Sequence, residues 1–268
     1  MVMVLLWPAG AGAQLTTVTE AGPQACFGGR SNAIMVKFHN PGMEAAEADV
    51  QMQLYQASSA TRAASGERSN WKRLRVMPGQ TVLESAEVGI PAVKAETPFV
   101  LAWLDAAGRK LGESDLAVYP TNLLDLLTNL GGGKAIGIFD VSRQIQQALQ
   151  KYNLPFDDFR DAGFAGFAGK LAVVAETGAA DESENLSARV ETLANSGVAV
   201  VWVQAPLQHR SPLEPALSAA PFGSGAIATV PARTVADLAD MPLAQLNLVQ
   251  AAKMSLSSAR GLLYREKP

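Results

Sequence analysis

The spacing of apolar positions changes about halfway along the chain. Up to Pro120, apolar and polar residues alternate in short runs; Asp49–Tyr55, for example, places Val50, Met52 and Leu54 on one face. Turn residues separate these runs, and further strands are predicted at residues 32–39, 71–76, 80–88, 99–105 and 111–119. Short strands at this spacing predict an immunoglobulin-like β-sandwich over residues 14–120.

After Lys134 the pattern becomes one of apolar runs alternating with helices. Apolar strands are predicted at residues 135–139, 171–175 and 198–203, and a further strand at residues 225–230. Helical spacing is visible in Ile145, Ala148, Leu149 and Tyr152, in Leu186, Val190 and Leu193, and in a terminal helix from Pro242 to about Leu263. This alternation predicts a flavodoxin-like α/β domain with a parallel sheet over residues 135–268.

Residues 121–134 are predicted to be a linker, with a short helix over 121–130 followed by Gly131-Gly132-Gly133. The first thirteen residues differ from the rest of the chain. A short apolar run from Val2 to Trp7 leads to Ala11-Gly12-Ala13, the small-residue pattern that a signal peptidase cleaves. Residues 1–13 are therefore predicted to be a signal peptide, although an apolar N-terminus of a cytosolic protein is the alternative.

Charge and composition exclude several classes of partner. The formal net charge is −3, and residues 14–120 carry 10 Lys/Arg against 11 Asp/Glu. Such a balanced surface does not suit nucleic-acid binding. No apolar run approaches the roughly 20 residues of a membrane span, so no integral membrane segment is expected once the signal peptide is removed.

The second half resembles the class I glutamine amidotransferase-like superfamily over residues 134–265. The resemblance rests on a helix ending in Ser196-Gly197 that leads into the strand VAVVWV, after two earlier strand–helix pairs. It implies a cysteine in a Gly-x-Cys-x-Gly turn after such a strand, and a late His-x-Glu pair. The order of the two domains, an immunoglobulin-like domain followed by an amidotransferase-like one, is similar to that of exported, often carbohydrate-associated bacterial proteins. Those proteins carry degenerate copies of the amidotransferase-like domain.

The residues that the resemblance implies are missing. Residues 203–207 are Val-Gln-Ala-Pro-Leu, and the one cysteine of the chain, Cys26, lies in the first half. His209 is followed two residues later by Ser211 where a glutamate would be needed. The sequence therefore predicts no catalytic residue, no metal site and no cofactor, and favours a degenerate domain that keeps the fold without the chemistry.

A ligand site can still be formed at the sheet edge. Ligands of open α/β sheets bind beyond the carboxyl ends of the strands. Asp140, Glu176 and Gln204 follow three predicted strands, and His209 lies shortly after them. These four residues are the candidate ligand-binding residues. In the alternative interpretation, Asp140 caps the next helix, Glu176 begins a loop and His209 faces solvent.

Three other features each have two interpretations. Trp71 and Trp103 are predicted to pack in the sandwich core, the alternative being a sugar-stacking platform. Cys26 is predicted to be a buried thiol rather than a reactive one. Phe164 and Phe167, in a glycine-rich repeat, belong to a tight loop or form an exposed contact patch.

These observations predict a non-catalytic binding or structural protein, periplasmic or secreted, with a protein or cell-envelope glycan as its partner. The alternative is a hydrolase or metal-dependent enzyme that uses Asp140, Glu176 and His209 at the edge of the α/β sheet. A small-molecule sensor at the same edge is a third hypothesis.

Overall fold

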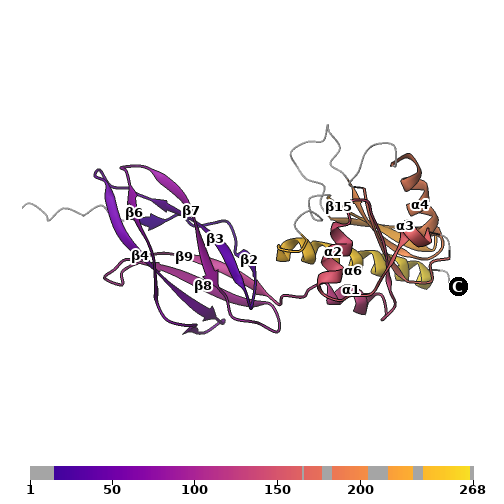
Figure 1. The fold of residues 1–268 in the computed structure, drawn as a ribbon, viewed down its shortest axis with the longest axis horizontal. Coiled ribbons are helices and arrows are strands. Elements are labelled where there is room, and N and C mark those ends of the chain that lie inside the picture. Colours follow the sequence, from indigo (N-terminus) through magenta and orange to yellow (C-terminus); the bar gives the residue numbers. More distant parts are fainter. Residues whose placement is uncertain (1–14, 165, 177–182, 205–216, 232–237, 266–268) are drawn as a thin grey trace, which may run out of the picture. The chain divides into compact units, whose positions relative to one another are not determined.

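The computed structural model describes residues 15–164, 166–176, 183–204, 217–231 and 238–265. The chain divides into two compact units between Thr121 and Asn122. The first unit consists of β-strands, and the second combines a sheet with helices (Figure 1). This mixed architecture confirms the predicted fold class. The predicted signal peptide lies outside the described residues.

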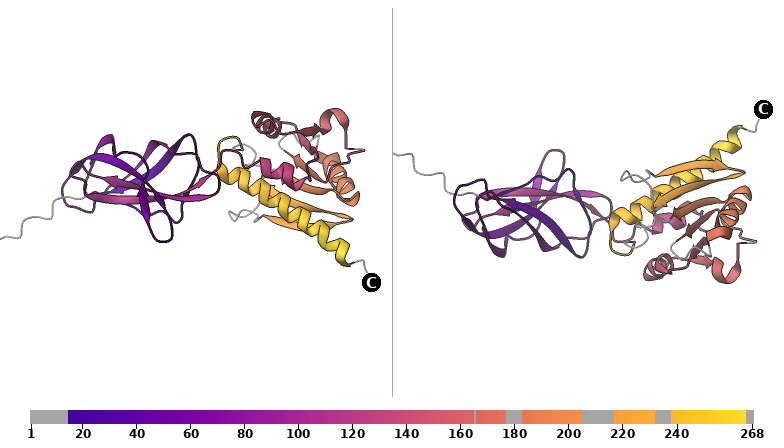
Figure 2. Two further views of the ribbon diagram at one scale, coloured as in Figure 1. Left: turned by 90° about the horizontal axis from the view of Figure 1, so that it is seen from below. Right: turned by 90° about the horizontal axis from the view of Figure 1, so that it is seen from above.

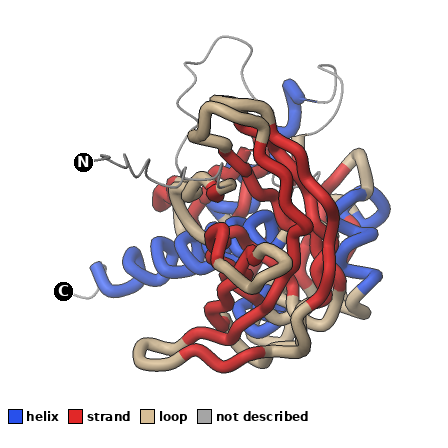
Figure 3. Tube along the Cα trace, turned by 90° about the vertical axis from the view of Figure 1, so that its left-hand side faces the viewer, coloured by secondary structure: helices blue, strands red, loops and turns tan. Residues whose placement is uncertain are grey.

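The first unit is a sandwich of two sheets, whose strands are red in Figure 3. The smaller sheet has the order β1-β3-β7. Its strands are β1 (Thr16–Thr17), β3 (Ser31–His39) and β7 (Thr81–Gly89). The larger sheet has the order β2-β9-β8-β4-β5, and β6 also pairs with β4. Its strands are β2 (Gln24–Phe27), β4 (Ala46–Ala57), β5 (Arg62–Ala64), β6 (Ser69–Val76), β8 (Thr97–Leu104) and β9 (Lys110–Tyr119).

The chain crosses between the two sheets from β3 to β4, from β6 to β7 and from β7 to β8, whereas β8 and β9 are neighbours in one sheet. Strands β3 and β7 pair in the smaller sheet, whereas β4, β8 and β9 pair in the larger one. The pairs are antiparallel except for β2, which runs parallel to β9. The short strands β1, β2 and β5 were not predicted, because runs of two to four residues carry too little alternation to be recognised.

The sandwich core is formed by alternate residues of both sheets, as the period-two pattern predicts. Its largest buried side chain is Trp103, which is fully buried and donates its indole N–H to Ser114 Oγ at 3.0 Å. The Trp103 ring lies 5.2 Å from Trp71 and 5.7 Å from Phe38, centroid to centroid. The structure thus places Trp103 within the core and packs Trp71 against it, as predicted.

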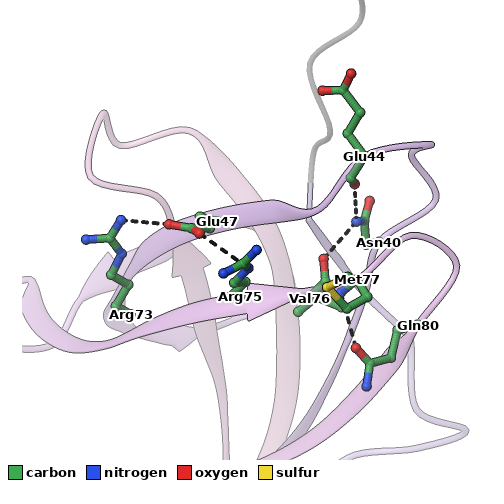
Figure 4. A network of polar contacts seen from close by, with 8 residues as sticks. All are labelled: Asn40, Glu44, Glu47, Arg73, Arg75, Val76, Met77 and Gln80. Atoms are coloured by element: carbon green, nitrogen blue, oxygen red, sulfur yellow. Dashed lines mark hydrogen bonds and ion pairs between the residues drawn. The ribbon is translucent and has the colours of Figure 1, made fainter.

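A buried asparagine closes one end of the sandwich, and Figure 4 shows its network. The Asn40 side chain donates to the carbonyl oxygens of Glu44 (2.8 Å) and Val76 (2.9 Å). Its own oxygen accepts from the backbone N–H of Gly42 at 2.9 Å. These bonds satisfy the polar atoms of a fully buried residue and fix the predicted Asn40-Pro41-Gly42 turn.

Strand β7 is an edge of the smaller sheet, because β3 is its ladder partner along nine residues and no described strand pairs with its other side. Glu84 lies on the face of β7 that also carries the buried Ala86 and Val88. Its carboxylate forms an ion pair of 2.6 Å with Lys72 of β6. A charged pair therefore stands where the edges of the two sheets meet.

The second unit contains a six-stranded sheet of order β11-β10-β12-β13-β15-β14. Its strands are β10 (Ile136–Asp140), β11 (Phe156–Asp158), β12 (Leu171–Ala175), β13 (Ala199–Gln204), β14 (Ser218–Phe222) and β15 (Gly225–Pro231). Every neighbouring pair is parallel except β14 with β15. Apart from this added antiparallel strand, the order is that of a flavodoxin-like sheet.

Helices cover both faces of this sheet. On one face lie α1 (Asp125–Leu130), α2 (Gln144–Lys151) and the long α6 (Pro242–Arg265), which Figure 2 shows in yellow along the sheet. On the other face lie α3 (Phe159–Ala162) and α4 (Ser183–Asn195). Helix α4 buries the side chains of Leu186, Val190 and Leu193 against the sheet, as predicted.

The segment expected to link the two domains contributes to this core. Leu124 and Leu127, next to and within α1, are buried among the residues of the sheet face beneath α6. The buried side chain of Gln245 in α6 accepts from the Leu123 N–H at 3.2 Å and donates to the Leu238 carbonyl at 2.9 Å. Residues 123–130 are therefore packed as part of the second unit.

Candidate functional site

The carboxyl edge of the parallel sheet carries three of the four predicted ligand residues. Asp140 ends β10, Gln204 ends β13, and Glu176 directly follows β12. The ladder continues through Glu176, whose N–H donates to the Val203 carbonyl at 2.9 Å. The fourth residue, His209, lies outside the described residues.

The Asp140 side chain is fully buried and bonded to the start of α2. One carboxylate oxygen accepts from the backbone N–H (2.9 Å) and hydroxyl (2.6 Å) of Ser142. The other accepts from the backbone N–H of Ile145 at 2.8 Å. A carboxylate in this position accepts hydrogen bonds from amides that the first turn of a helix leaves unpaired. Its negative charge is also stabilised by the positive, N-terminal end of the helix dipole. Asp140 therefore has the capping role that the sequence gave as its alternative.

The strand register places the side chains of Asp140 and Gln204 on opposite faces of the sheet. Asp140 pairs with Ala175, and Ala175 with Val203, so these three share the face covered by α2 and α6. Because side chains alternate along a strand, Gln204 lies on the opposite face from Val203. The geometry thus brings Asp140 and Gln204 to the same edge but not to the same side. Within the described ranges, no group of three or more His, Cys, Asp or Glu residues is placed to hold a metal ion.

A concave surface lies instead on the outer face of the larger sandwich sheet. It is a groove of about 640 Å³, within the range of ligand sites. Cross-strand pairing places Val100 opposite Asp115 and Pro98 opposite Ala117. The small apolar side chains of Pro98, Val100 and Ala117 line the groove together with the charged residues Arg62, Glu96 and Asp115. The groove exists because small outward residues of adjacent strands fall side by side.

Charged side chains line this groove. The Arg62 guanidinium donates to Glu113 at 2.6 Å, and Lys110 also contacts Glu113, at 2.7 Å. Partial burial acts to raise the pKa of Glu113, but hydrogen bonds from Lys110 and Arg62 outweigh it and lower the pKa below its ordinary value. The one positive residue of the groove lining is thus already paired with a carboxylate.

Two carboxylates line the groove together with Arg62. Glu96 is exposed and accepts a hydrogen bond from the Tyr119 hydroxyl; burial, and then the charge of Glu96, raise the pKa of Tyr119. Asp115 is exposed, and in the part of the chain that the structure describes its side chain forms no hydrogen bond or ion pair. The three charged residues of the lining sum to −1, and Asp115 is available to a ligand.

Sequence reasoning did not identify the groove. The outward positions of β9 could be recognised from alternation in KLGESDLAVY, which sets Glu113, Asp115 and Ala117 on one face. Their neighbours across the sheet depend on register, including the irregularity between Trp103 and Leu104. Alternation within one strand does not determine that register.

Cys26 and the two phenylalanines of the glycine-rich repeat are all packed against other residues. Cys26 is buried, and its burial raises its pKa to about 11 in spite of the nearby charge of Arg30, so the thiol stays protonated and unreactive near neutral pH. Phe164 and Phe167 contact the buried Phe159, with ring centroids 4.8 and 5.0 Å away. Both rings are partly buried against the sheet face beneath α4.

Comparison with known proteins assigns no family. No family model matches the chain, and no curated protein matches it. Among solved structures, the chain is distantly similar to the alkylpurine DNA glycosylase AlkC of Pseudomonas fluorescens bound to DNA (17% identity, TM-score 0.31), covering 41% of this chain and 32% of that one.

Two β-glucosidases are similar to the same degree. The Listeria innocua enzyme with gluconolactone has 11% identity and a TM-score of 0.29, covering 40% of this chain and 16% of that one. The Bifidobacterium adolescentis GH3 enzyme has 8% identity and a TM-score of 0.28, covering 40% and 17%. The chain thus spans a third or less of these proteins, and likeness at this level carries no argument about function. In the described residues, no helix has the length and apolar character to cross a membrane.

Proposed function

We propose that this chain is a non-catalytic binding protein of the cell envelope, exported by its N-terminal segment, whose partner is a protein or a glycan. The observation that carries the proposal is the state of Asp140. Its carboxylate accepts three hydrogen bonds from the start of α2 and is fully buried. An acid of this kind holds the fold together and has no lone pair directed at solvent for acid–base chemistry.

The second unit fits the same proposal as a degenerate amidotransferase-like domain. Its central strand order is that of a flavodoxin-like sheet, which supports the resemblance. Gln204 stands at the end of β13, where the family's active members have their nucleophile turn. The sandwich, with its groove on the larger sheet, would then supply the binding surface.

A sedimentation experiment tests this function. The chain from Gln14 onward is mixed with washed, insoluble cell-envelope material, which is either untreated, protease-treated or digested with a glycan-degrading enzyme. We expect the chain to pellet with the untreated material and to lose this binding after one of the two treatments. The Asp115→Lys variant should pellet less, whereas Asp49→Lys, on the outer face of the same sheet but not in the groove lining, should pellet as the wild type does.

A parallel assay addresses catalysis. The same chain is incubated with glycoside, ester and peptide substrates, with and without added Zn²⁺ or Mg²⁺. Turnover above a heat-denatured control that is lost in Glu176→Gln, with thermal stability unchanged, would overturn the proposal in favour of the enzyme hypothesis. N-terminal sequencing of the exported protein should give Gln14 as the first residue.

A further inference from the structure

The groove combines an apolar floor with an unpaired negative charge. The floor consists of Pro98, Val100 and Ala117 from two adjacent strands. Val100 is only 4% exposed, so its neighbours cover most of it, and Pro98 and Ala117 supply the accessible apolar surface. A ligand that contacts these two residues needs an apolar part there.

The negative charge of the groove lining favours a positively charged ligand. Arg62 is already neutralised by Glu113, whereas Asp115 has no partner among the described residues. Glu96 accepts a hydrogen bond from the Tyr119 hydroxyl. A cationic group placed near Asp115 and Glu96 would gain charge-assisted hydrogen bonds, whereas an anion would be repelled.

Resting on the proposed binding function, we infer that the groove binds an extended polypeptide segment through a lysine or arginine side chain. Such a side chain has an aliphatic stem and a charged end, and it buries the stem on apolar surface while the charge stays near water. The stem would lie on Pro98 and Ala117, which face each other across the two strands, and the charged end would reach Asp115 and Glu96.

A glycan fits these observations less well. Sugar rings in protein sites commonly stack on exposed aromatic faces, and the one aromatic residue of the lining, Phe99, is a core residue 2% exposed. A neutral sugar also does not compensate the charge of Asp115. The groove therefore favours a basic peptide over a neutral oligosaccharide, and the experiment compares the two directly.

The test is an NMR titration of the isotope-labelled chain from Gln14 onward with three probes. They are the blocked peptide acetyl-Ala-Lys-Ala-Lys-Ala-amide, its twin with glutamine in place of lysine, and a chitin-type tetrasaccharide. We expect the lysine peptide to shift the amide signals of Val100, Asp115 and Ala117. The glutamine twin should bind at least tenfold more weakly, and 300 mM NaCl should weaken lysine-peptide binding several-fold.

Two matched variants identify the residue responsible. Asp115→Asn keeps the size of the side chain and should weaken lysine-peptide binding about tenfold. Asp49→Asn makes the same change on the outer face of the same sheet and should leave binding within twofold. Thermal unfolding of both variants should match the wild type, because both side chains are exposed.

The outcomes separate this inference from the function on which it rests. Equal affinity of the two peptides, or equal effects of the two variants, would overturn the inference. Groove signals that respond to the tetrasaccharide and not to the lysine peptide would also overturn it, while the proposed binding function would stand. Turnover in the catalytic assay would overturn the proposed function itself.

Discussion

Asp140 and Asp115 show how differently the two units use a carboxylate near a strand. Asp140 ends a parallel strand, is fully buried and is bonded to the helix that follows. Asp115 lies within an antiparallel strand and is exposed. Its carboxylate forms no hydrogen bond or ion pair with the described residues. In an α/β unit each strand leads into a helix whose first amides need acceptors, so a polar residue at the strand end is readily used by the fold. An outward position in the middle of a sandwich strand has no helix N-terminus next to it, so its side chain is not required as a hydrogen-bond acceptor.

The largest expected effect follows from removing the Asp140 carboxylate. Asp140→Ala leaves two backbone N–H groups and a hydroxyl without their acceptor, and we expect a loss of about 2–4 kcal/mol in the free energy of unfolding. Urea unfolding, followed through amide signals of the α/β unit, measures this loss.

The comparison predicts no such loss at the other aspartate. Asp115→Ala should change the free energy of unfolding of the sandwich by less than about 0.5 kcal/mol. Asp157→Ala, at an exposed position of the α/β unit, is the second control and should be equally neutral. If Asp140→Ala were as stable as these two, the capping role would be wrong.

Asp105 provides an intermediate case within the sandwich. Its carboxylate accepts from the backbone N–H of Arg109 (2.8 Å) and from its guanidinium (2.6 Å). Burial acts to raise the pKa of Asp105, but these bonds, with one from the Ala107 backbone, lower it below the ordinary value. Asp105→Ala should therefore destabilise the sandwich by about 1–2 kcal/mol, between the other two aspartates.

The same carboxylate gives the sandwich a predictable acid sensitivity. A pKa lowered by folding means that the stabilisation is complete above the unfolded pKa of about 4 and disappears as the pH falls through the folded pKa. Thermal unfolding of the sandwich between pH 6 and pH 2 should show this loss in the wild type. The loss should be smaller in Asp105→Asn; an identical pH dependence in both proteins would assign the acid sensitivity to other groups.

A small effect on stability is expected at Glu113, the partner of the groove residue Arg62. Glu113→Gln removes the partner of Arg62 and Lys110, an exposed ion-pair network worth less than about 1 kcal/mol. Its consequence for binding is more informative than its effect on stability. With Arg62 no longer neutralised, the lysine peptide should bind about twofold more weakly; unchanged binding would show that Arg62 does not act on the groove.

The elements predicted best were those whose pattern is set by burial on both faces. The strand Leu171–Ala175 was placed at its observed ends, because a wholly apolar run between helices has few alternatives. Strand β11, of sequence Phe-Asp-Asp, and β14, which contains Pro221, were missed. Both are edge strands, where one side of the strand has no ladder partner and the sequence need not be apolar.

The candidate site was harder to predict than the fold. Strand ends correctly located Asp140 and Gln204 at one edge, but the side to which each points depends on register. The groove depends on the register of several strands that are distant in the sequence, such as Val100 of β8 opposite Tyr55 of β4. Such pairings are set by packing of the whole sandwich, which no local pattern encodes.

The ion pair between Lys72 and Glu84 bears on how this chain behaves at high concentration. An open strand edge of nine residues is a template on which a second molecule can add a strand and begin to aggregate. Any strand that added to β7 would have to strip water from a carboxylate and an ammonium group at the same place, which is costly. The pair of charges thus raises the free-energy cost of adding a strand to this edge of the sandwich.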